Sequence, residues 1–149
     1  MKKFVLFGLI GFVLTGCGDD KVTKEYLVGE WDCSYEEYES KYDSKFKEYN
    51  AYSLKSSEQF KQSYKIVDDV LMSKIADKDA FEVDLNKVYS NLYLEGETDN
   101  CNYSIKRVLV KKSNNKFSWT EETFFDCTFD KDSIDKFKTK RERICTRIK

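Results

Sequence analysis

Apolar and polar residues alternate along several stretches of the chain, which is the pattern of β-strands with one buried face. Between residues 26 and 35, for example, Trp31, Cys33 and Tyr35 are separated by single polar residues. Turns are expected at residues 68–69, 77–79 and 95–100, and a polar loop at residues 130–135. The alternation predicts strands at residues 26–35, on both sides of the acidic pair within 64–76, and at 81–85, 88–94, 102–112, 116–125 and 142–148.

The clearest local prediction is a hairpin formed by residues 102–112 and 116–125. Asn114 and Asn115 lie between these stretches, and Asn tolerates the positive φ that tight hairpin turns require. With the turn centred on this pair, facing residues have numbers that sum to about 229. Cys101 and Cys127 meet this condition to within one residue, so we expect them to face each other at the open end of the hairpin.

Residues 36–62 are compatible with two structures. Tyr38, Tyr42, Phe46 and Tyr49 recur at intervals of three and four residues with charged residues between them, which fits an amphipathic helix. Tyr is also a good strand residue, so the same stretch is compatible with long twisted strands that carry solvated Tyr side chains. The fold predicted for the whole chain is mainly β, a small antiparallel β-barrel or sandwich, with this stretch as the one candidate helix.

The N-terminal segment has the order of features found in a secretory signal. Lys2 and Lys3 precede a short apolar run, which is well below the roughly 20 residues needed to span a bilayer as a helix. The run ends in Leu14-Thr15-Gly16-Cys17, which resembles the lipobox of bacterial lipoproteins. We therefore expect a cleaved signal peptide at residues 1–16, an anchored tether at residues 17–24 and one domain at residues 25–149.

The lipobox resemblance implies a specific modification of Cys17. In bacterial lipoproteins the cysteine thiol receives a diacylglycerol, the signal peptide is cut before that cysteine, and the freed amine is often acylated with a fatty acid such as palmitate. Several acyl chains hold a protein stably on a membrane, whereas one chain binds only marginally. The expected location is the bacterial cell membrane, with the domain in the periplasm. Gly18 departs from the Asp that marks inner-membrane retention in enterobacteria, so inner and outer membrane both stay open.

Four cysteines remain once Cys17 is assigned to lipid. An even number of cysteines in an exported chain predicts two disulfides, and the alternative is free buried thiols. The hairpin argument pairs Cys101 with Cys127, which leaves Cys33 to pair with Cys145. The second bond would join the first strand to the last, as expected where these strands are neighbours in an up-and-down barrel.

Composition excludes several classes of protein. The chain has no histidine, so the Ser-His-Asp and Cys-His arrangements of nucleophilic catalysis are excluded. It carries 26 Lys and Arg against 27 Asp and Glu, and loss of Lys2 and Lys3 with the signal peptide makes the acidic excess larger. This charge does not suit a nucleic-acid-binding protein. The scarcity of Gly and Pro and the 15% aromatic content indicate a folded core.

Neither a metal site nor an enzyme is predicted. Some oxygen ligands have calcium-loop spacing, but the mid-loop Gly and the full set of ligands are missing. Adjacent carboxylates could supply an acid–base pair, but the pattern does not distinguish them from solvated charge. We expect no cofactor. The residues concerned are Asp77, Asp79 and Glu82, Asp130, Asp132 and Asp135, and the pairs Asp68-Asp69 and Glu121-Glu122.

Two functions fit these features. The first is a non-enzymatic interaction module that acts on another envelope protein. The overall design resembles small enterobacterial and prophage-encoded lipoproteins, and more loosely the lipid-anchored lysozyme inhibitors, which implies inhibition, phage exclusion or a role in envelope stress. The second is a carrier of a small apolar ligand, because Gly29-x-Trp31 resembles the opening of lipocalin-like barrels, where the Trp plugs one end.

Overall fold

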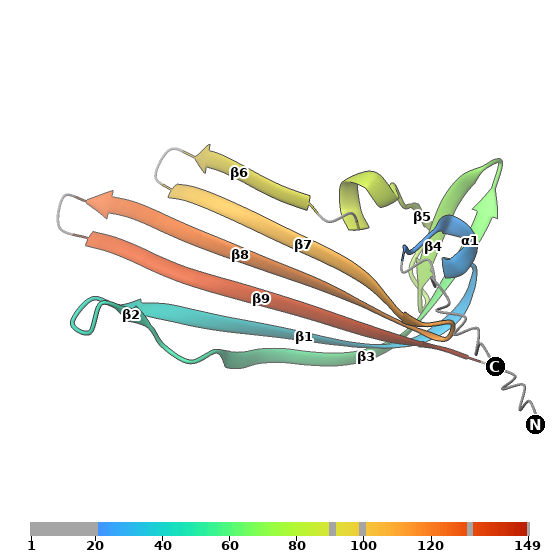
Figure 1. Ribbon diagram of the computed structural model, residues 1–149, viewed down its shortest axis with the longest axis horizontal. Helices are drawn as coiled ribbons and strands as arrows, with labels where there is room; N and C mark the ends of the chain where they lie inside the picture. The colour runs from blue at the N-terminus through green and yellow to red at the C-terminus, as the bar shows by residue number, and fades with distance from the viewer. Residues whose placement is uncertain (1–20, 90–91, 99–100, 131–132, 149) are drawn as a thin grey trace, which may run out of the picture.

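The computed structural model describes residues 21–89, 92–98, 101–130 and 133–148. The stretch that resembles a lipobox, Leu14 to Cys17, lies outside the described residues. Nine strands form one antiparallel sheet in the order β5-β4-β3-β1-β9-β8-β7-β6, with β2 paired to β1 (Figure 1). The strands are β1 (Gly29–Asp43), β2 (Glu48–Tyr49), β3 (Ser53–Val67), β4 (Val70–Ile75), β5 (Phe81–Glu82), β6 (Leu92–Thr98), β7 (Cys101–Ser113), β8 (Lys116–Asp130) and β9 (Ser133–Arg147).

The sheet curls into a half-barrel, which confirms the mainly β prediction. The first and last strands, β1 and β9, are neighbours, as expected for up-and-down order. The two ends of the sheet are β5 and β6, which are consecutive strands that do not pair within the described residues. Two short helices accompany the sheet: α1 (Lys24–Leu27), before β1, and the π-helical turn η1 (Leu85–Tyr89), between β5 and β6.

The candidate helix at residues 36–62 is wrong, because the stretch forms most of β1, all of β2 and the first part of β3. The spacing of its aromatic residues instead reflects a hairpin. Tyr42 and Tyr49 are paired across β1 and β2, and their ring centroids are 5.1 Å apart. β1 hydrogen-bonds to β3 on one side and to β9 on the other along its length. This pairing determines the structure of the stretch, although the spacing of its aromatic residues also fits a helix.

Several predicted boundaries also differ. The strand at residues 81–85 is shortened to two residues because η1 begins at Leu85. The predicted turn at residues 95–100 is wrong for residues 95–98, because these residues belong to β6 and pair with β7. The polar loop at residues 130–135 is largely replaced by strand, because β9 begins at Ser133. The strand predicted from residue 26 begins too early, because Tyr26 and Leu27 are the last two residues of α1. Thr23 caps that helix by accepting a hydrogen bond from the Tyr26 amide.

The predicted β7–β8 hairpin is confirmed. The numbers of facing residues sum to 228 in every pair from Cys101 opposite Cys127 to Lys111 opposite Phe117. A register shift then brings Ser113 opposite Lys116. Both disulfides, Cys33–Cys145 and Cys101–Cys127, are present as predicted from the cysteine arithmetic. Each joins residues that lie directly opposite each other on neighbouring strands.

The hydrophobic core lies at the end of the sheet near the described termini. Trp31 is fully buried, donates from Nε1 to the Leu27 carbonyl over 2.7 Å and meets the Phe117 ring edge-on at 4.8 Å. Val22 is also buried in this core, so the folded part of the chain begins before residue 25. We call the sheet surface that carries these side chains the core face. Its fully buried large side chains are Trp31, Tyr64, Leu71 and Phe117, and the buried Leu27 of α1 belongs to the same core.

The half of the core face that lies away from this hydrophobic core carries a second aromatic pair and a disulfide. Phe125 and Phe137 stack there at 4.6 Å, and the Cys101–Cys127 disulfide lies at the same end. On the opposite face the connection between β1 and β3 folds over the sheet, where Tyr49 contacts Phe124 at 5.8 Å. We call this half, which lies away from the described termini in Figure 1, the distal half.

Candidate functional site

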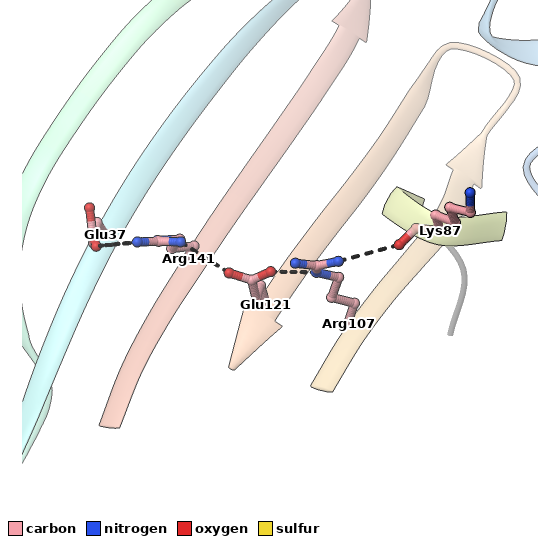
Figure 2. Close-up of polar contacts among 5 residues, drawn as sticks. All are labelled: Glu37, Lys87, Arg107, Glu121 and Arg141. Carbon is pink, nitrogen blue, oxygen red and sulfur yellow. Dashed lines mark hydrogen bonds and ion pairs between the residues drawn. The ribbon is translucent and has the colours of Figure 1, made fainter. Parts of the chain in front are cut away.

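A row of alternating charges crosses the middle of the core face. Glu37 on β1, Arg141 on β9, Glu121 on β8 and Arg107 on β7 are consecutive partners in the strand register (Figure 2). They share a face with Cys33 and Cys145 because each lies an even number of residues from a core position on its own strand. We call these four residues the charged row.

Glu121 is the centre of the charged row. It is 4% exposed and accepts hydrogen bonds from Arg107 Nε and, over 3.1 Å, from Arg141 Nη1. Arg141 also donates to Glu37 Oε1 from Nε and Nη2, each over 3.2 Å. At the other end, Arg107 Nη1 donates to the Lys87 carbonyl of η1 over 3.3 Å. A buried carboxylate is tolerated here because two arginines bind it.

A second row of facing residues lies between the charged row and the hydrophobic core, and it combines cationic and aromatic side chains. The Arg143 guanidinium lies 5.5 Å from the ring centroids of both Trp119 and Phe60, a cation–π arrangement. Its Nη1 donates to Gln62 Oε1 over 3.4 Å. Tyr35, on the same face, has a raised pKa because burial favours its neutral form more than the positive charge of Arg141 opposes it.

The charged row is a continuous set of ion pairs. Both carboxylates are held by arginines, and the four formal charges cancel. The Arg141 side chain is 43% exposed and is the most accessible member of the row. An apolar ligand on this part of the core face would have to remove water from charged groups, which is unfavourable.

A separate groove of about 830 Å³ lies between α1, β4, β5 and η1, next to β7. The Lys24–Asp69 ion pair, with its atoms 2.8 Å apart, lies on its wall. The groove has a mixed lining, in which charged side chains stand beside apolar ones. Its apolar lining consists of Val22, Val70, Leu71, Val83, Leu85 and Leu109.

The acidic sequence motifs do not form sites. No group of three or more potential metal ligands occurs among the described residues, and Asp132 lies outside them. Glu121 and Glu122 are adjacent on β8 and therefore lie on opposite faces of the sheet. Asp68 and Asp69 form the β3–β4 turn, both with positive φ, so their backbone conformation explains the pair.

Sequence reasoning missed the charged row, because its members come from four strands and meet only through register. A partial signal was present. In the hairpin of β8 and β9, acidic Glu121 faces basic Arg141, and Glu122 faces Lys140. Once these strands are paired, complementary charge at facing positions is a recognisable pattern.

The chain has no match among family models, curated proteins or solved structures. In the described part of the chain, the helices are all too short or too polar to cross a bilayer.

Proposed function

We propose that this chain is a lipid-anchored lipoprotein of the bacterial envelope, with a domain that binds another envelope protein without catalysis. The lipobox, Leu14 to Cys17, supports anchoring on the periplasmic side of a membrane. The absence of histidine supports a non-enzymatic role. Inhibition, phage exclusion and envelope-stress response are the roles that such binding serves in the proteins this chain resembles.

The observation that carries the binding proposal is the charged row on the core face of an open sheet. A closed lipocalin-like calyx would enclose its ligand, but β5 and β6 do not pair within the described residues. Arg141 remains partly exposed beside Glu37. Such a surface favours contact with a polar protein partner, since charged groups at a partly hydrated surface contribute to specificity.

Anchoring is tested by replacing Cys17 with Ser and following membrane fractionation. Wild-type protein is expected in the membrane fraction, with a mass increase at the N-terminal cysteine that matches the acyl groups. The Cys17→Ser variant should lose that mass and leave the membrane fraction, whereas Cys33→Ser with Cys145→Ser should keep it. A Cys17→Ser variant that stays membrane-bound by salt-resistant association would exclude lipid anchoring through this residue.

Partner binding is tested with the oxidised domain from Asp19 onward, immobilised and exposed to detergent-solubilised envelope and to a panel of lysozymes. We expect one stoichiometric protein that free domain competes away. Arg141→Gln should reduce its retention, and Lys65→Gln is the matched control because Lys65 is exposed on the other face. No protein retained under any condition would contradict the binding proposal.

Carriage of a small apolar ligand is a second candidate, favoured by the groove between α1 and η1. A hydrophobic fluorescent probe that competes with fatty acid should bind the wild type if the groove is a ligand site. Leu109→Lys should then abolish binding, while Leu54→Lys, a change at an exposed distal position, should not. Equal probe binding by both variants would exclude the groove.

A further inference from the structure

The two borders of the sheet differ in how they are protected from pairing with other chains. Natural edge strands are usually short, or carry lysine, proline or a bulge. At one border β5 has two residues, and the part of β3 that does not pair with β4 carries Lys55 and Lys61 and faces the register shift at Glu37/Tyr38. This border has the usual protection against a further strand.

The other border, β6, is neither short nor broken by a bulge, and its charged side chains are two glutamates. Its seven residues, Leu92–Thr98, contain no Lys or Pro, and they pair with β7 in an unbroken register. In Figure 1 no described element lies beyond it. Alternate residues of an antiparallel strand direct their N–H and C=O groups away from the paired neighbour. The outer edge of β6 therefore offers a row of backbone hydrogen-bonding groups.

The side chains of β6 indicate the partner that would fit. Tyr93 and Leu94 are 62% and 43% exposed on opposite faces. Glu95 and Glu97 are exposed on the same face as Tyr93, and Tyr93 donates its hydroxyl hydrogen to Glu95 over 2.6 Å. Within the described residues neither glutamate has an ion-pair partner. A strand with Lys or Arg at alternate positions would complement them.

A second copy of the chain is a poor occupant of this edge. If two β6 strands paired antiparallel about Glu95 or Gly96, glutamates would face glutamates across the new interface, and like charges at facing positions are destabilising. Gly96 lies in the middle of the strand, and the Tyr103 ring fills the space that a side chain at this position would take. The glycine lies beside a surface hollow of about 580 Å³ lined by Tyr103, Asn102 and Phe124.

We propose that β6 receives an extended segment of an envelope protein, which adds to the sheet as a strand and presents basic side chains to Glu95 and Glu97. Main-chain hydrogen bonds would supply affinity, and the alternating side chains would supply specificity. This inference rests on the proposed function, because it adds a second contact surface, the outer edge of β6, to the charged row.

The test uses the full-length chain in non-ionic detergent and a seven-residue peptide of alternating Lys and Val. We expect binding together with slowed amide hydrogen exchange in β6. A peptide of alternating Glu and Val should not bind. The Lys-Val peptide with every amide nitrogen methylated keeps the charge but lacks backbone donors, and it should not slow exchange.

Variants separate edge pairing from general charge attraction. Glu95→Gln with Glu97→Gln should weaken peptide binding roughly three- to tenfold, as expected from two cross-strand charge pairs. Glu48→Gln with Glu58→Gln removes the same charge from exposed sites elsewhere and should leave binding unchanged. Equal binding by both double variants, or by the methylated peptide, would overturn the edge-strand inference.

The two proposals fail separately. If an envelope protein is captured but its retention is unaffected by the Glu95 and Glu97 changes, the domain is a binding module that does not use β6 in this way. If the Lys-Val peptide slows exchange in β6 but no envelope protein is retained, the edge is competent and the proposed function is wrong.

Discussion

Glu121 on β8 lies directly opposite Arg141 on β9, and an Arg141 Nη1 to Glu121 Oε1 hydrogen bond of 3.1 Å joins them. Glu121 also binds Arg107, so two neighbouring guanidinium groups share this nearly buried carboxylate. Removing it would leave Arg107, whose side chain is 24% exposed, without its carboxylate. The charged row is thus a unit whose parts are unequal in their effect on folding.

We expect Glu121→Ala to lower the free energy of unfolding by about 2–4 kcal/mol, because a partly buried cation loses its partner. Glu122→Ala is the control, since this exposed neighbour lies on the other face, and its effect should stay within about 0.5 kcal/mol. The combination Glu121→Leu with Arg107→Leu should be less destabilising than either single change. Urea unfolding of the five variants measures these differences, and similar values for Glu121→Ala and Glu122→Ala would refute the prediction.

The two disulfides should differ in their contribution to stability. Cys33 and Cys145 are 112 residues apart, whereas Cys101 and Cys127 are 26 apart. In the chain-entropy model these separations correspond to about 4.8 and about 3.5 kcal/mol, because the longer loop restricts the unfolded chain more. Replacing Cys33 and Cys145 with Ala should therefore lower the unfolding midpoint more than replacing Cys101 and Cys127. The reverse order in urea would show that native-state packing outweighs loop length.

Alkaline pH should destabilise the fold through buried tyrosines. Burial raises the pKa of Tyr35 above its ordinary value of 10.0, so the folded state holds this proton to higher pH than the unfolded state does. The stabilisation is complete below about pH 10 and is lost as pH rises from there through the folded-state pKa. Tyr35→Phe should make the fall of stability above about pH 10 less steep than in the wild type. Urea midpoints measured across that range provide the check, and an unchanged slope would count against the assignment.

Gly96 should not tolerate a side chain while Tyr103 occupies its present position. A Cβ atom at residue 96 would lie 2.3 Å from Tyr103 Cζ and Oη, so the tyrosine ring would have to leave its place above Gly96. We expect Gly96→Ala to destabilise the domain by about 1–2 kcal/mol. In the Tyr103→Ala background the same change should have little effect. Strictly additive free energies in this double-mutant cycle would contradict the proposed contact.

Local patterns were sufficient for the β7–β8 hairpin. Asn114 and Asn115 marked its turn, and counting outward from them brought Cys101 opposite Cys127. The pairing of Cys33 with Cys145 then followed by elimination. These predictions succeeded because a hairpin register depends on a few neighbouring residues.

Other features depended on contacts between distant segments. The spacing of Tyr42 and Tyr49 fits a helix as well as it fits the hairpin that the chain forms, and only pairing with β3 and β9 decides between them. The alternation at residues 81–85 gave no sign that the strand would stop short and that a π-helical turn would begin at Leu85. The charged row required the registers of four strands, so no single stretch of sequence contains it.

The disulfide between β1 and β9 has a mechanical consequence. If Cys17 is held in a membrane and a partner pulls on β6 along the strand direction, the load passes from β1 through β9, β8 and β7 to β6 (Figure 1). Hydrogen bonds perpendicular to the strands are then loaded together in shear, because antiparallel ladder bonds lie across the strand direction. Unravelling from the N-terminal side would stop at Cys33, which is covalently joined to the last strand. The domain would therefore transmit force from partner to membrane and lose only the short segment before that crosslink.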